Sequence, residues 1–285
     1  MKRRVVVPGA VLLTAVGLAG LLAGAEPATP VTLKTTEFGR GPTVVLLHAL
    51  GSGRMVWMPT AKKLLASHRV VMVDLPGHGE SPLPDPFSLQ ACAEALDQVL
   101  AKQKADSTVL VAHGLGGLLA LQEIQAHPDR VRGLIVIDAA TRFPTPIPEQ
   151  QQQYFFQMLD TNYDDILKSM MMRQGRDSTQ GNELYSQAQA VPPATMKAYL
   201  KAVMNADVSP ALKKMKPAFL FVASGRLWAA DKDWPAVAKQ MGFDDPTTIA
   251  NHRVADCGSL IMKEQPDSLA AVIAGFTARA VATKK

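Results

Sequence analysis

The chain has 285 residues, of which 47% are hydrophobic and 19% are charged, a composition that can bury a substantial core and that excludes a disordered chain. The formal net charge of +5 is small and spread along the chain, so we expect no nucleic-acid-binding surface. The six histidines lie without metal-ligand spacing, and we therefore expect no metal site and no cofactor.

The first 25 residues have the layout of a secretory signal peptide. Lys2, Arg3 and Arg4 precede an apolar stretch that ends in the small residues of "AGA" just before Glu26. This order predicts cleavage near Ala25 and export to the periplasm or the medium. The alternative is an uncleaved anchor, because about 20 apolar residues can just span a bilayer. Such an anchor is the only membrane contact that we expect.

Export makes the two cysteines of the chain worth examining, because oxidising compartments permit disulfides. Cys92 lies in a helix-like run and Cys257 near the end of a strand-like run. Their positions do not show whether the two side chains meet. A bridge and two buried free thiols both stay open.

From Val31 onward, short β-like runs alternate with longer helical patterns. Residues 31–39 and 43–48 suggest a hairpin that leads into a buried strand. Strand-like runs follow at 68–74, 108–113, 132–138, 218–224 and 247–255. Apolar residues at helical spacing predict helices at 87–103, 117–127 and 266–282. The alternation predicts an α/β fold with a doubly wound, mostly parallel sheet, in one domain over residues 26–285.

One region, at about residues 141–216, breaks this alternation. It has no strand-like run and is rich in Met, Gln and Tyr, as in "EQQQQYFFQM" and "KSMMMRQG". A helical insertion after a core strand is the kind of element that forms a lid over a site. Its Met and Phe side chains either line an adaptable apolar pocket or pack the lid onto the core.

Four loops carry a resemblance to a known family. They read "LLHALGSG" at 46–53, "VDLPGHGESP" at 73–82, "VAHGLGGLLAL" at 111–121 and "ADCGSLIMKEQPDSL" at 255–269. Together and in this order they closely resemble the α/β-hydrolase superfamily, especially its lidded esterase, lactonase, dehalogenase and haloperoxidase-like members. The resemblance covers nearly all of residues 31–280 and implies the α/β-hydrolase fold.

The resemblance implies an oxyanion hole made of two backbone N–H groups, those of Leu50 and Leu115. Leu115 opens a helix whose free amides and positive dipole end face any negative charge that develops there. The loop departs from the family pattern at Ala49, where glycine is usual.

The three positions of the catalytic triad carry other residues. In the elbow pattern G-x-S-x-G the serine stands on a strained strand-to-helix turn, and here Gly114 occupies that place. Ser259 stands where the family has its histidine base, and a hydroxyl cannot accept a proton as imidazole does. Trp228 stands at the position of the acid. The resemblance therefore implies a degenerate triad.

Three carboxylates are candidate substitute acids. Asp138 ends a core strand where some relatives carry their acid, although its common role there is structural, and Asp231 and Asp233 follow the position of Trp228. Among the histidines, His113 precedes Gly114 and is expected to point back into the sheet, and His48 is expected to brace the oxyanion loop.

These residues leave three hypotheses for function. The first is an exported protein of the hydrolase fold that binds a small, mainly apolar carbonyl or carboxylate ligand without serine-hydrolase turnover. The second is an active hydrolase or lyase, acting on an ester or lactone, that uses an aspartate and water. The third is a protein-interaction module with a collapsed pocket. Whether the chain is an enzyme therefore stays open at this point.

Overall fold

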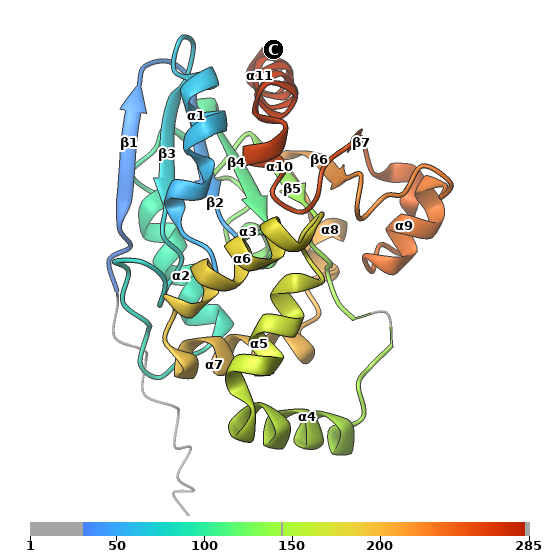
Figure 1. Ribbon diagram of the computed structural model, residues 1–285. Helices are drawn as coiled ribbons and strands as arrows, with labels where there is room; N and C mark the ends of the chain where they lie inside the picture. The colour runs from blue at the N-terminus through green and yellow to red at the C-terminus, as the bar shows by residue number, and fades with distance from the viewer. Residues whose placement is uncertain (1–30, 144, 283–285) are drawn as a thin grey trace, which may run out of the picture.

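A computed structural model describes residues 31–143 and 145–282, and Figure 1 shows a central sheet with helices on both faces. The predicted signal peptide lies outside the described residues. Within these residues the sheet has seven strands, in the order β1-β3-β2-β4-β5-β6-β7. Their bounds are β1 (Thr35–Gly39), β2 (Thr43–Leu47), β3 (Arg69–Val73), β4 (Thr108–His113), β5 (Gly133–Ile137), β6 (Ala218–Ser224) and β7 (Asn251–Val254). The predicted doubly wound, mostly parallel sheet is confirmed.

The predicted hairpin at the start of the sheet is wrong. Strand β1 pairs antiparallel with β3, from Thr35 opposite Val73 to Gly39 opposite Arg69, while β2 lies between β3 and β4 and is parallel to both. All later pairings are parallel. Strands that are adjacent in sequence do not pair here. Strand β2 is buried along its whole length and needs a neighbouring strand on each side, whereas the half-exposed β1 suits an edge of the sheet.

Two apolar layers cover the two faces of the sheet, because successive strand residues point to opposite sides. One layer contains Val45, Leu47 and Val71 with residues of α2 (Leu89–Leu100) and α3 (Leu115–Ala126). The other contains Val44, Leu46 and Val70 with residues of α1 (Met58–Leu64) and α11 (Pro266–Ala282). The sheet core is thus buried on both faces, as its continuous Val, Ile and Leu runs predict.

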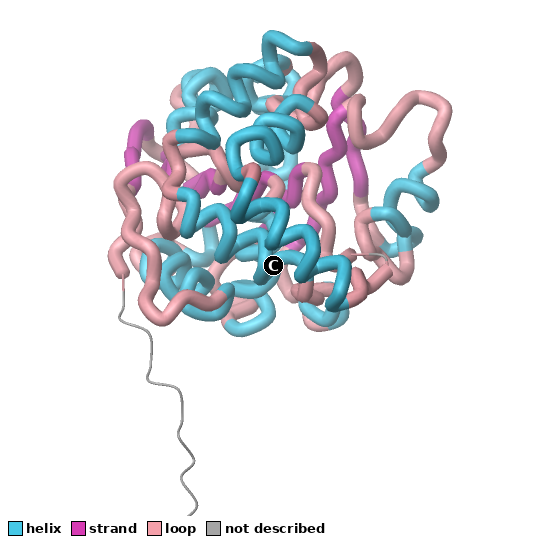
Figure 2. The backbone as a smooth tube through the Cα atoms, turned by 60° about the horizontal axis from the view of Figure 1, so that its bottom comes forward, coloured by secondary structure: helices cyan, strands magenta, loops and turns pink. Residues whose placement is uncertain are grey.

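In the described part of the chain, five helices lie between β5 and β6. They are α4 (Glu149–Thr161), α5 (Tyr163–Met172), α6 (Ser178–Gln189), α7 (Pro193–Met204) and α8 (Pro210–Lys213). Figure 1 shows α4 to α7 gathered at one end of the sheet, and Figure 2 shows the same layered arrangement from another side. These helices lie within the insertion predicted at about residues 141–216. Most of α4 is solvated, since Leu159 is its one buried residue, while α5 to α7 bury side chains such as Met171 and Met196.

The remaining elements are short. They are α9 (Trp234–Gln240), α10 (Ile261–Glu264) and three 3-10 turns, η1 (Arg54–Trp57), η2 (Ala105–Ser107) and η3 (Pro246–Thr248). The strand expected at 247–255 is therefore shorter than its pattern, because η3 takes up its first residues. Among the described residues, no helix combines the length and the apolar character that crossing a bilayer requires.

The disulfide hypothesis is excluded by the same two-layer arrangement. Cys92 and Cys257 are both buried free thiols. Cys92 belongs to the α2–α3 layer and Cys257 to the α1–α11 layer. The Cys92 thiol contacts the Tyr199 hydroxyl at 3.2 Å, and the Cys257 thiol donates to the Val254 carbonyl at 3.2 Å. The sheet separates the two sulfurs.

Candidate active site

Gly114 occupies a sharp turn between β4 and α3. Its φ of 54° and ψ of −118° lie in a region that glycine adopts readily and that costs another residue about 1 to 3 kcal/mol. The Gly114 amide donates to the Ile137 carbonyl at 3.0 Å, and this hydrogen bond fixes the turn against β5. The backbone geometry expected of a nucleophile elbow is therefore present at a residue without a side chain.

The helix after this turn lies very close to the sheet. A Cβ atom on Gly116 would lie 2.7 Å from the His48 carbonyl oxygen, and one on Gly117 would lie 2.6 Å from the Cβ of Ala139. Both distances are shorter than real contacts, so these two positions require glycine. This close approach fixes the start of α3 against the loop after β2.

The two amides expected to form an oxyanion hole lie on these adjoining segments. Within residues 31–143 and 145–282, neither the Leu50 nor the Leu115 N–H group donates to a protein acceptor. Leu115 is the first residue of α3, so its amide belongs to the positive end of the helix dipole. Leu50 and Gly114 each keep partial solvent exposure. Amides without a protein acceptor are chemically suited to an anion or a polarised carbonyl oxygen, and the assignment of an oxyanion hole stays a prediction.

Two buried histidines brace the loop that carries Leu50. His48 Nε2 accepts from the Leu75 amide at 3.0 Å, and His78 Nε2 accepts from the Gly51 amide at 3.3 Å. Their Nδ1 atoms lie 2.8 Å and 3.0 Å from the carbonyls of Ala49 and Pro76. Burial lowers the pKa of both imidazoles, so both are neutral at pH 7 and suited to these paired contacts.

Ala49 and Gly114 are complementary. A Cβ atom added to Gly114 would lie 2.9 Å from the Cβ of Ala49, which is closer than two carbon atoms pack. Position 49 is the one at which the loop departs from the glycine usual in the family. The alanine methyl therefore uses space that the side chain of a nucleophile would need, and a serine at position 114 would require movement of this loop.

Ser259, at the place of the base, is buried and already engaged. Its hydroxyl donates to the Gln174 carbonyl at 2.9 Å, in the segment between α5 and α6. The same segment accepts hydrogen bonds from Arg226, whose guanidinium contacts the Arg173 carbonyl at 2.6 Å and 3.1 Å. The helical insertion thus covers position 259, and Ser259 acts there as an anchor for it.

The acid position holds part of an aromatic cluster. The Trp228 ring lies 5.4 Å from that of Trp234, and its indole N–H donates to the Lys232 carbonyl at 2.8 Å. Asp231 is exposed, and Asp233 is an exposed helix cap whose carboxylate accepts from the Ala236 amide at 2.9 Å. These two acids lie at the surface and do not join the elbow.

Asp138 differs from the other two candidate acids in being half-buried, with its carboxyl group turned away from solvent. Its Oδ1 accepts from the Ser224 amide at 2.8 Å, while its Oδ2 is shielded from solvent and has no hydrogen-bond partner in the described structure. Burial raises the pKa of the carboxyl to about 6. Its φ of 45° is unusual for a residue other than glycine. Strain together with an unpaired buried oxygen is typical of functional sites.

His113, directly before Gly114, is buried, and burial lowers its pKa to about 4. It lies within β4, in register with Ile137 of the neighbouring strand. The imidazole is therefore neutral at pH 7. This environment fits the expectation of a core histidine.

A sequence profile of the alpha/beta hydrolase family matches residues 44–272, which is most of the chain. The chain belongs to the α/β-hydrolase family. Two solved structures support this fold. An esterase from Exiguobacterium antarcticum has a TM-score of 0.72 at 16% identity, over 87% of this chain and 96% of that one. The enol-lactonase of Burkholderia xenovorans LB400 has a TM-score of 0.69 at 18% identity, over 88% of this chain and 100% of that one.

The curated relatives match shorter segments of the chain. The pimeloyl-[acyl-carrier protein] methyl ester esterase of Pseudoalteromonas atlantica is 40% identical over 114 residues, which are 39% of this chain and 43% of that protein. The chain spans less than half the length of this relative and of two similar esterases from Aeromonas species. Likeness to esterases is therefore strong within one segment of the hydrolase fold.

Two features of the site escape the sequence patterns. The contact between positions 49 and 114 joins loops 65 residues apart, although both departures from the family pattern are visible in the sequence. The anchoring of Ser259 to Gln174 has no sequence signal, because a serine hydroxyl and a backbone carbonyl carry no spacing rule.

Proposed function

We propose that the chain recognises a carboxylic ester, or the carboxylate derived from one, at an esterase-type site that lacks serine chemistry. The observation that carries this proposal is the free pair of N–H groups at Leu50 and Leu115 beside a turn whose reactive position is Gly114. Such donors stabilise a carbonyl oxygen or a carboxylate. The likeness to methyl ester esterases supports an ester as the ligand class.

In this proposal the ligand also contacts a hollow that begins at Ser52, two residues after Leu50. This hollow of about 480 Å³ lies between residues 52–56 and the end of α6. Its apolar side chains, Met55, Val56 and Val191, suit the acyl or alcohol part of an ester, while the charged side chains of Arg54, Asp74, Glu80 and Lys263 line the rest of it. In this proposal the insertion of residues 141–216 acts as a lid, and the chain works outside the cytoplasm after removal of residues 1–25.

The second candidate is an ester hydrolase that uses water and Asp138. It is favoured by the names of the relatives and by the unpaired Oδ2 of this buried carboxyl. A pKa of about 6 leaves Asp138 largely ionised at pH 7 and able to accept a proton from water. Without a nucleophile and a base, turnover should be slow, because loss of a serine triad removes on the order of a millionfold in rate.

Binding is tested with methyl butyrate and butyrate by saturation-transfer NMR on the full chain. Leu115→Pro removes one N–H group at the first helical position, where proline is well tolerated, and Leu115→Ala is the matched control that keeps the amide. We expect binding to survive in the alanine variant and to fall at least tenfold in the proline variant. Absence of binding to the parent protein, or equal binding by both variants, would contradict the proposal.

Chemistry is tested with a fluorophosphonate probe and p-nitrophenyl acetate. We expect no labelling of the parent protein and negligible turnover. Robust labelling would show a nucleophile elsewhere and overturn the absence of serine chemistry. Slow turnover that Asp138→Asn abolishes and Asp231→Asn leaves intact would establish the second candidate. The reversion must combine Ala49→Gly with Gly114→Ser and Ser259→His, since the methyl of Ala49 obstructs a side chain at position 114.

A further inference from the structure

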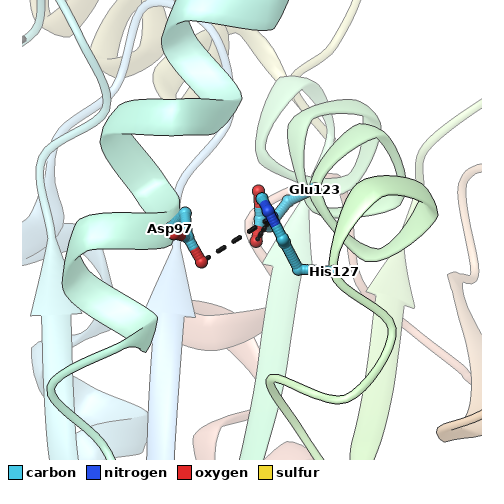
Figure 3. A group of neighbouring side chains, drawn as sticks. All are labelled: Asp97, Glu123 and His127. Carbon is cyan, nitrogen blue, oxygen red and sulfur yellow. Dashed lines mark hydrogen bonds and ion pairs between the residues drawn. The ribbon is translucent and has the colours of Figure 1, made fainter.

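Three side chains with metal-binding atoms meet between α2 and α3, away from the elbow. Asp97 projects from α2, while Glu123 lies in the last turn of α3 and His127 is the C-cap residue that follows the helix (Figure 3). One ligand atom of each residue lies within 4.8 Å of the other two. Glu123 lies nine residues after Gly114, which is about 14 Å along α3 at a rise of about 1.5 Å per residue.

The spacing of these atoms fits a small tetrahedral ion. The distance from His127 Nδ1 to Glu123 Oε1 is 3.0 Å, and that to Asp97 Oδ1 is 3.7 Å. Zinc bonds of about 2.0 to 2.1 Å place tetrahedral ligands about 3.3 Å apart. The two distances lie on either side of this value, so small side-chain rotations bring both oxygens and the nitrogen onto one ion.

The burial of the three groups forms a gradient toward solvent. The Glu123 side chain is 1% exposed, that of Asp97 20% and that of His127 42%. A hollow of about 330 Å³ that includes Ala126, His127 and Arg130 opens on the exposed side. The cluster therefore combines a buried floor with an entry path, which a metal site requires.

In the described structure, Arg130 is the one positively charged side chain outside the cluster that contacts it. Its Nη2 donates to Asp97 Oδ2 at 3.0 Å, and its Nε donates to Asp97 Oδ1. Carboxylates that bind metals are commonly held by such hydrogen bonds, which orient their free lone pairs. Burial and the neighbouring Asp97 carboxylate raise the pKa of Glu123 to about 9, so Glu123 releases a proton when a cation binds.

We propose that Asp97, Glu123 and His127 bind Zn²⁺, with water as the fourth ligand, and that the ion clamps α2 to α3. Two carboxylates and one imidazole are a donor set suited to zinc, whereas Ca²⁺ requires six to eight oxygens. The proposal runs against the expectation of no metal site. That expectation considered histidine spacing and overlooked a Glu-x-x-x-His pair that only the packing of α2 completes.

The test is titration of the full, chelator-treated protein with Zn²⁺ by calorimetry, and with Co²⁺ by visible spectroscopy. We expect one ion per chain, a tetrahedral Co²⁺ absorption band, a rise in Tm with Zn²⁺ and no response to Ca²⁺. His127→Gln and Glu123→Gln should each weaken Zn²⁺ binding by about tenfold or more and abolish the Co²⁺ band.

His252→Gln is the matched control, because His252 is an exposed histidine on β7, outside the cluster. The affinity of the His252→Gln variant for Zn²⁺ should equal that of the parent protein. His127 is partly exposed, so its replacement tests the site even if loss of the buried Glu123 impairs folding. No binding by the parent, or binding that His127→Gln leaves unchanged, would overturn the proposal.

Discussion

Gly114 and Ala49 are best understood as one pair of residues. The elbow retains a positive φ at position 114, and the methyl of Ala49 lies where a side chain on Gly114 would be placed. A glycine at 114 relieves both the backbone strain and this contact. The residues at positions 49 and 114 are therefore physically coupled, and the packing of the loop favours glycine at position 114.

This coupling predicts a non-additive effect on stability. Gly114→Ala should lower the free energy of unfolding by about 2 to 4 kcal/mol, because it adds strain of about 1 to 3 kcal/mol to a steric overlap. In an Ala49→Gly background the same change should cost about 1 kcal/mol less. Urea denaturation of the four proteins of this double-mutant cycle measures the difference, and strict additivity would refute the coupling.

At the scale of elements, the segment from β6 to α9 is held together by aromatic packing around Trp228, the residue predicted at the acid position. Trp228 and Trp234 join the rings of Phe221 and Phe243 in an aromatic cluster over the sheet. Asp233 caps the N-terminus of α9, and its carboxylate accepts a hydrogen bond from the amide of Ala236, three residues later. This is the usual N-cap geometry. The segment is thus organised by packing and capping.

Asp233 and Asp231 form a matched pair that tests this interpretation. Asp233→Ala should lower the free energy of unfolding by about 1 kcal/mol through loss of the cap, with ligand binding unchanged. Asp231→Ala removes an exposed carboxylate two residues away and should change stability by less than about 0.5 kcal/mol. Thermal unfolding of both variants measures this. A defect in ester turnover without a change in Tm for Asp233→Ala would instead assign it a catalytic role.

At the scale of the whole molecule, the sheet divides the core into two layers, and each layer contains one cysteine. Burial raises the pKa of Cys92 to about 11 and also raises that of Cys257, so neither thiol is reactive in the folded protein. The fold therefore has no disulfide, even in an oxidising compartment.

Thiol titration checks this separation. The folded protein should react slowly with Ellman's reagent, and the denatured protein should release two equivalents without prior reduction. Dithiothreitol should leave the Tm unchanged, because no covalent bridge constrains the unfolded chain. A Tm that falls on reduction would show that the two sulfurs are joined and would contradict the two-layer placement.

The sequence predicts a large part of this fold because the periodicity is strong. The closing helix was expected at 266–282 and is observed at Pro266–Ala282, and the strand at 108–113 agrees equally well. Buried parallel strands and amphipathic helices leave local patterns of hydrophobicity. The place of β1 could not be predicted in this way, because strand pairing depends on which neighbours remain available in the sheet.

By itself the sequence determined the fold class and the order of its elements, and it predicts that Gly114, Trp228 and Ser259 stand at the triad positions, because each follows from local pattern or motif position. Only the tertiary structure decided which distant groups meet. It placed Ala49 against Gly114, Ser259 on Gln174, and Asp97 beside Glu123 and His127. Such contacts depend on how loops and helices pack at ångström distances, and no spacing along the chain encodes them.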